Sequence, residues 1–167
     1  MNNLQESIAK RIPLIFLRTV VVLIGVGVLV FMLWEPHLEG RNAHATLFQI
    51  YFNDPFLAYA YTASIAFFTA IYQTFRLIGY IGKNKAFSPN SVRSLRTIKY
   101  CAMAIIGFVA APVVYLFIVR PGDDIAGGVA VGLFLIFVSV VAASVASVLE
   151  RILQSVVAIK NEDDLTV

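Results

Sequence analysis

The chain has 167 residues and a formal net charge of +3; 59% of its residues are hydrophobic and 14% are charged. An ordinary soluble domain has roughly 45–50% apolar and about 25% charged residues, and near this size it buries only about 70% of the surface that its unfolded chain exposes. The composition therefore excludes a soluble globular fold and intrinsic disorder, and the lone Cys101 excludes a disulfide-stapled secreted domain. What this leaves is an integral membrane protein.

Four apolar stretches are long enough to cross a bilayer, whose hydrocarbon core of about 30 Å requires about 20 residues of helix. They cover residues 14–34, 56–81, 98–119 and 125–150. Apolar residues fall on every face of each stretch without period-two alternation, which favours helices over the strands of a barrel. We therefore expect a single domain over residues 1–167, an all-α bundle of four transmembrane helices.

The chain before the first span contains apolar residues four apart, namely Leu4, Ile8 and Ile12, with Lys10 and Arg11 directed elsewhere. This pattern is typical of a short amphipathic helix that lies at the membrane surface. We expect it to anchor the N-terminal segment at the interface.

The loop after the first span contains four residues of metal-ligand types, Glu35, His37, Glu39 and His44. Their spacing matches no established metal-binding signature. We therefore predict neither a metal site nor a cofactor, and binding of a metal by the histidines is the alternative.

The second span is the most polar of the four. Its polar side chains are Thr62, Ser64, Thr69, Tyr72, Gln73 and Thr74. Thr69 and Gln73 lie one turn apart on one face, where they are suited to hydrogen bonds between helices worth about 0.6 kcal/mol each. The alternative is that this face lines a small cavity of a transporter or channel component.

The loop before the third span begins a basic amphipathic helix. Ser88 is placed as its N-cap and Pro89 as its first helical residue, where a missing N–H is tolerated. Apolar positions recur on one face and basic positions on another, namely Val92, Leu95 and Ile98, and Arg93, Arg96 and Lys99. Such a helix lies at the headgroup level and leads into the third span, and it either sets topology or docks a cytoplasmic partner.

The fourth span has small residues on one face, Gly128, Gly132, Ser139 and Ala143. Such a stripe lets another helix approach closely, either within the bundle or in a second copy of the chain. The apolar pattern continues to Lys160, about 54 Å from Ile125 at 1.5 Å per residue, so the helix is expected to project into the cytoplasm as a stalk. Residues 151–167 then form a cytoplasmic helical tail.

Orientation follows from the basic residues. Eleven of the 13 lysines and arginines lie beside the N terminus, the loop between the second and third spans, or the C terminus, and only Arg41 and Arg120 lie on the other side. Cytoplasmic segments carry the excess of Lys and Arg, so both termini are expected in the cytoplasm. The positive charge thus indicates membrane topology and not direct binding of nucleic acid.

Three charged residues fall inside or at the inner ends of the spans, Arg18, Arg76 and Glu150. Intramembrane charges are functional candidates by default. We predict a cluster in which Glu150 pairs with Arg18 or Arg76 and the other arginine binds a lipid phosphate. The alternative is that both arginines extend to the headgroups.

Sequence motifs of catalysis are absent. The chain has no phosphate-binding glycine loop, no nucleophile elbow, no cysteine pair and no carboxylate near the middle of a span. We therefore expect a protein that is not an enzyme.

Two segments carry a family resemblance. The first is Asn-Lys-Ala-Phe-Ser-Pro-Asn at residues 84–90, followed by Val92, Leu95, Arg96 and Ile98, and the second is the ending Lys-Asn-Glu-Asp-Asp-Leu-Thr-Val at residues 160–167. Both segments resemble the motifs of a bacterial four-span membrane protein family catalogued as domain of unknown function 2975. Members have no established activity and are commonly encoded beside a small helix-turn-helix regulator. The resemblance therefore implies a partner of a DNA-binding protein, located in the bacterial inner membrane.

Both motifs fall on the expected cytoplasmic face. We predict that this face binds or restrains a cytoplasmic regulator and contacts membrane lipids, and that the chain is able to form a homo-oligomer. The candidate partner-binding residues are Phe87, Ser88, Asn90, Arg93, Leu95, Arg96, Asp163, Asp164, Leu165 and Thr166.

Overall fold

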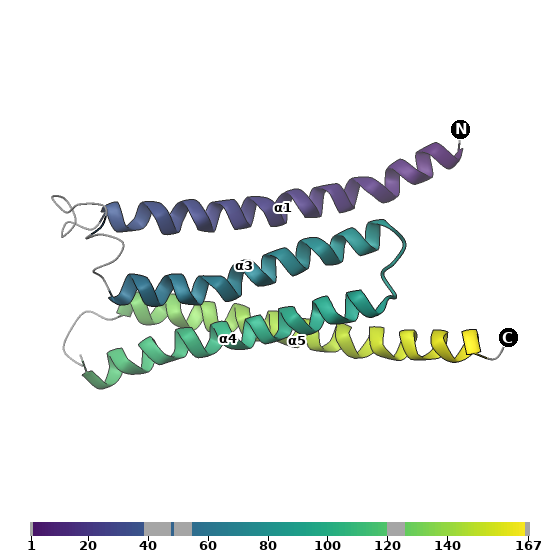
Figure 1. The fold of residues 1–167 in the computed structure, drawn as a ribbon. Coiled ribbons are helices and arrows are strands. Elements are labelled where there is room, and N and C mark those ends of the chain that lie inside the picture. Colours follow the sequence, from purple (N-terminus) through teal and green to yellow (C-terminus); the bar gives the residue numbers. More distant parts are fainter. Residues whose placement is uncertain (1, 39–47, 49–54, 120–125, 166–167) are drawn as a thin grey trace.

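The computed structural model describes residues 2–38, 48, 55–119 and 126–165. Four long helices lie in these ranges: α1 (Asn2–Leu38), α3 (Pro55–Gly82), α4 (Pro89–Val119) and α5 (Ala126–Leu165). They run side by side, α1 and α4 in one direction and α3 and α5 in the other (Figure 1). The described residues form no strand, so the prediction of an all-α fold is confirmed.

Three of these helices are long and apolar enough to cross a membrane, over Arg11–Trp34, Pro89–Ile118 and Ala126–Lys160. Helix α3 does not meet this criterion because its threonine, tyrosine, serine and glutamine side chains lower its hydropathy. The structure thus supports three of the four predicted spans by length and composition.

Large apolar side chains point outward along these helices. Phe16, Phe31 and Phe134 are between 64% and 69% exposed, whereas the buried apolar residues are few and mostly small or medium in size. Water would oppose so large an apolar surface, and a lipid environment would not. The exposed surface therefore agrees with a bundle that lies in a membrane.

The short surface helices expected before the first and third spans are not separate elements. The N-terminal residues continue without a break into the first span as α1, and the basic segment forms the first turns of α4. Helix α5 is also continuous, with 40 residues and a length of about 60 Å. The expectation of one long final helix is confirmed, and its C-terminal part extends past the start of α4 in Figure 1.

The α3–α4 connection is closed by a cap at each side. After α3, Asn84 adopts the left-handed conformation with φ 56°, Lys85 N donates to Tyr80 O over 2.8 Å, and Asn84 N donates to Ile81 O over 3.1 Å. This pair of bonds is a Schellman motif, which asparagine can complete in place of glycine. Before α4, Ser91 N donates to Ser88 Oγ over 3.4 Å, so the predicted N-cap is confirmed.

The helices pack in chain order. Helix α4 makes its most extensive contact with α5 and a smaller one with α3, and α1 packs against α3. Close approach of α5 to α4 depends on Gly132, where an added Cβ would lie 2.5 Å from Val113 Cγ2. Among the other residues of the predicted small-residue stripe, Ser139 is buried, Ala143 is half-buried and Gly128 is exposed.

Candidate functional site

A buried carboxylate joins α4 and α5 near the end of the bundle where the chain termini lie. Glu150 on α5 is only 5% exposed. Arg96 Nε donates to its Oε1 over 2.7 Å, and Lys99 Nζ donates to its Oε2 over 2.6 Å. Gln154 Nε2 adds a third bond to Oε1 over 3.2 Å. We call these four residues the Glu150 cluster.

The Glu150 cluster satisfies a charge that would otherwise be costly to bury. A buried carboxylate requires charged or hydrogen-bonding partners, and removal of a partner from a buried ion pair is strongly destabilising. Two cations face one anion, so the cluster has an excess of one positive charge. The Arg96 side chain is 52% exposed, and the cluster therefore opens to the surface on that side.

The structure does not bring together the charged residues that the sequence paired. Arg18 lies on α1 with its Cζ 5.2 Å from the centre of the Phe75 ring, and Arg76 Nη2 donates to Tyr80 Oη over 2.6 Å. Glu150 pairs instead with cations of α4. The physical reason is the order of packing, because α5 contacts α4 whereas α1 contacts α3.

The observed partners of Glu150 follow from hairpin symmetry. Arg96 lies 25 residues before Pro121 and Glu150 lies 26 residues after Asp124, and the sequence Pro-Gly-Asp-Asp at residues 121–124 is typical of a turn. Residues equally distant from a tight turn between antiparallel helices meet side by side. Counting outward from the turn would therefore have predicted this pair.

The polar residues of α3 have partners within the bundle. Ser94 Oγ on α4 donates to Gln73 Oε1 over 3.1 Å, so Gln73 makes the expected bond between helices. Thr69 Oγ1 instead donates to Ile65 O over 2.7 Å within its own helix, and the hydroxyls of Thr62 and Thr74 do the same one turn back. In α3 these groups therefore serve helix packing and backbone bonding.

The capped connection between α3 and α4 carries exposed residues of the predicted partner-binding set. Phe87 is 56% exposed, and Asn90 and Arg93 are exposed as well. We call these three residues the loop surface. Leu95 is 3% exposed and belongs to the core, so it is not available to a partner as the sequence suggested.

The remaining predicted partner-binding residues have other positions. Ser88 caps α4 and is half-buried, and Arg96 belongs to the Glu150 cluster. Asp163, Asp164 and Leu165 lie in the last turns of α5, and Thr166 lies outside the described residues. The predicted inner surface is therefore reduced to the loop surface, the exposed part of Arg96 and the end of α5.

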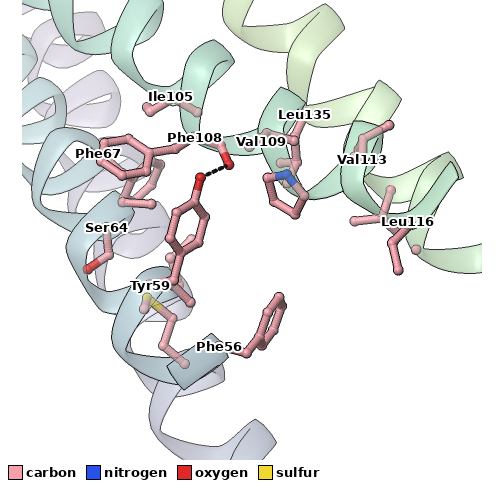
Figure 2. Close-up of a pocket in the computed structure, with 18 residues that line it drawn as sticks. Phe56, Tyr59, Ser64, Phe67, Ile105, Phe108, Val109, Val113, Leu116 and Leu135 are labelled. Atoms are coloured by element: carbon pink, nitrogen blue, oxygen red, sulfur yellow. Dashed lines mark hydrogen bonds between the residues drawn. The ribbon is translucent and has the colours of Figure 1, made fainter. Parts of the chain in front are cut away.

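A cavity that sequence reasoning did not foresee lies at the opposite end of the bundle from the Glu150 cluster. It has a volume of about 420 Å³ and an almost entirely apolar lining from all four helices. Figure 2 shows Tyr59 at its centre, pointing toward α4. The hydroxyls of Tyr59 and Ser64 that reach this cavity are both hydrogen bonded, to Phe108 O and Tyr61 O. The cavity thus suits hydrocarbon and not a polar solute.

The tyrosine bond in this cavity compensates for a proline. Pro112 has no N–H, so the regular helical bond to the carbonyl of Phe108, four residues earlier, is missing. Tyr59 Oη on α3 donates to that carbonyl over 2.8 Å, and its ring meets the Phe108 ring edge-on at 5.4 Å. The pair therefore connects α3 to α4 in this half of the bundle.

Metal-ligand types are not gathered in the described part of the chain. No group of three His, Cys, Asp or Glu residues there could hold a metal ion. Glu39 and His44 of the first long loop lie outside the described residues, and Cys101 is half-buried.

These features define a helical membrane protein with polar contacts concentrated near the end where its termini lie. Residues 41–167 match the family described as "Protein of unknown function (DUF2975)", and the chain belongs to this family. It is 40% identical over 159 residues to the uncharacterized membrane protein YoaS of Bacillus subtilis (strain 168), covering 95% of this chain and 99% of that relative. No solved structure matches the chain. The resemblance inferred from the two motifs is thereby confirmed.

Proposed function

We propose that the protein is a non-enzymatic, multi-pass protein of the bacterial inner membrane that binds or restrains a cytoplasmic helix-turn-helix regulator through the loop surface and the end of α5. The single observation that carries this proposal is the exposure of Phe87 in a connection that is capped on both sides. A large aromatic side chain held in place in this way is the kind of anchor that partners bind.

A four-span topology with both termini in the cytoplasm is part of the proposal. Helices α1 and α4 run in the same direction, so the chain has to return between them, and α3 is the segment that does so (Figure 1). Its 28 residues give a length of about 42 Å, more than the hydrocarbon core requires. The excess of lysine and arginine at the end where the termini lie supports a cytoplasmic position for that end.

Charge gives further support to a docking role. Arg93, six residues after Phe87 in the chain, is exposed as well, and the Glu150 cluster adds the partly exposed Arg96. The tail of α5 supplies acidic residues of the opposite sign. Basic and acidic groups near one end of the bundle suit a partner with complementary charges and speed its association.

Co-purification with the regulator tests the proposal. The full-length membrane protein is co-expressed with a small helix-turn-helix regulator of the kind that the family resemblance implies, and extracted in mild detergent. We expect the double variant Phe87→Ala, Arg93→Glu to lose most of the bound regulator, and removal of residues 161–167 to weaken binding further. The matched control is Arg11→Glu, which reverses an exposed charge on α1, outside the loop surface. Equal recovery of the regulator with the double variant and the wild type would refute the proposal.

A role as a transporter or channel component was the alternative. It relied on the polar face of α3, whose Gln73 and threonine side chains have partners inside the bundle. The large cavity has an apolar lining. These observations favour the docking role.

A further inference from the structure

Arg18 has a charge that the described part of the protein does not compensate. Its Nε is enclosed and has no hydrogen-bond partner, and no carboxylate of the described residues forms an ion pair with it. Its Cζ lies 5.2 Å from the centre of the Phe75 ring, and an added Cβ on Gly79 would lie 2.9 Å from its Nη2. The guanidinium is thus held against a glycine of α3, and its end groups are the donors left for an external anion.

An apolar groove lies next to this guanidinium, between α1 and α3. It has a volume of about 280 Å³ and is lined by Val21, Val22, Phe68, Ile71, Tyr72 and Phe75. One water molecule occupies about 30 Å³ in the liquid, so the groove has room for roughly nine groups of that size, such as methylenes. It has room for part of one hydrocarbon chain.

A second unpaired arginine borders the same groove. Arg76 has its Cζ 5.7 Å from the centre of the Tyr72 ring, and Tyr72 lines the groove. The hydroxyl of Tyr80 accepts a bond from Arg76 Nη2, but no acid of the described ranges pairs with this arginine. Two positive charges therefore stand beside one apolar groove.

The two arginines and the apolar groove follow one another along the helices in the same order as the charged head and the hydrocarbon chain of an amphiphile. Gly79, beside the Arg18 guanidinium, is nearer than Phe75 to the end of α3, and the groove continues back to Phe68. Charge thus lies toward the end of the bundle and apolar surface toward its middle. A phosphate with an attached acyl chain has the same sequence of charge and hydrocarbon.

We propose that the α1–α3 groove is a binding site for an anionic phospholipid, whose phosphate binds Arg18 and Arg76 and whose acyl chain lies against Val22 and Tyr72. The argument for this occupant is charge complementarity, because a guanidinium that has no carboxylate partner gains a charge-assisted hydrogen bond when an anion reaches its end groups. The site is independent of the proposed regulator docking, which uses the loop surface and the end of α5.

Native mass spectrometry of the full-length protein in detergent tests the site. The protein is titrated with phosphatidylglycerol or with phosphatidylcholine of identical acyl chains. We expect phosphatidylglycerol to bind about tenfold more tightly or better, given about 1 kcal/mol for each arginine near the headgroup. Arg18→Gln weakens phosphatidylglycerol binding about fivefold, because Arg76 remains. The control Arg93→Gln, which neutralises an exposed arginine of α4, leaves binding unchanged.

Two further variants keep the test decisive if Arg18→Gln folds poorly. Gly79→Ala retains every charge but displaces the guanidinium, and Val22→Trp fills the groove; each should weaken phosphatidylglycerol binding several-fold. Glycerol phosphate, which has no acyl chain, should not compete at the same concentration. Unchanged binding to Arg18→Gln or to both of the other variants, equal binding of the two lipids, or full competition by glycerol phosphate would overturn the proposal.

Discussion

Replacement of Tyr59 by phenylalanine removes the one hydroxyl that connects α3 to the proline-freed carbonyl of α4. The Oη–Phe108 O distance is 2.8 Å, and Pro112 leaves that carbonyl without its regular helical donor. The phenylalanine ring retains the edge-on contact with the Phe108 ring at 5.4 Å. The change in stability therefore measures the hydrogen bond and little of the packing.

The expected loss is about 1–2 kcal/mol. Hydrogen bonds between transmembrane helices average about 0.6 kcal/mol, with a maximum near 1.7, but an acceptor left unsatisfied costs about 1–3 kcal/mol. Tyr59→Phe belongs toward the upper part of this range because lipid cannot donate to the Phe108 carbonyl. In a Pro112→Ala background the alanine N–H restores the helical bond, so the same replacement should cost less than half as much.

Unfolding of the purified protein in mixed micelles by increasing dodecyl sulfate, followed by circular dichroism, gives the four free energies of this double-mutant cycle. We expect a coupling energy of about 1 kcal/mol between positions 59 and 112. Tyr115→Phe is the control, because Tyr115 is exposed on α4, and its effect should stay below about 0.5 kcal/mol. Strict additivity of Tyr59→Phe and Pro112→Ala would show that the proline does not create the need for the tyrosine.

Three other substitutions test the contacts that fix the bundle. Glu150→Gln leaves two cations of α4 without their anion and should lower the stability of the protein by about 2 kcal/mol. The loss is smaller than for a fully buried ion pair because the Arg96 side chain is half exposed. Thermal unfolding in detergent measures this change, and unchanged stability would contradict the prediction. Gly132→Ala places a methyl 2.5 Å from Val113 Cγ2 and should cost about 1–3 kcal/mol, whereas Gly127→Ala, with open space around it, should not destabilise. Asn84→Ala forces alanine into φ 56° and should cost about 1–2 kcal/mol, whereas Asn84→Gly should be nearly neutral; equal effects would argue against the left-handed cap.

Features set by neighbouring residues could be predicted from the sequence. The N-cap at Ser88 depends on a side chain and a backbone group three residues apart, and the long final helix depends on an unbroken apolar pattern up to Lys160. Glu150 could also be singled out from the sequence, because a carboxylate at the end of a span is costly to bury and requires a partner. None of these inferences requires knowledge of which helices touch.

Features that depend on helix neighbours were missed or assigned to the wrong partner. The sequence placed Arg18, Arg76 and Glu150 at similar positions along their spans, so position along the span favoured the wrong partners, and the packing of α5 on α4 brings Arg96 to Glu150 instead. The sequence shows that Pro112 leaves the carbonyl of Phe108 without its helical donor. That the Tyr59 hydroxyl replaces this donor follows only from the packing of α3 against α4. Leu95 was assigned to the surface because its helix was expected to lie alone at the headgroups, and packing buries it instead.

The two proposed sites lie on helices that differ in how many contacts hold them in the bundle. Helix α4 contacts α5 through the Glu150 cluster and α3 through Tyr59 and Gln73. The loop surface at the start of α4 is therefore attached to a helix that is held from two sides. Among the described elements α1 packs chiefly against α3, and Arg18, which contacts the Phe75 ring that lines the groove between them, has its Nε without a hydrogen-bond partner. A lipid at Arg18 therefore adds contacts where the protein has fewest. Loss of that lipid should loosen α1 and leave the loop surface intact, so hydrogen exchange after Arg18→Gln is expected to rise in α1 and to stay unchanged in the first turns of α4.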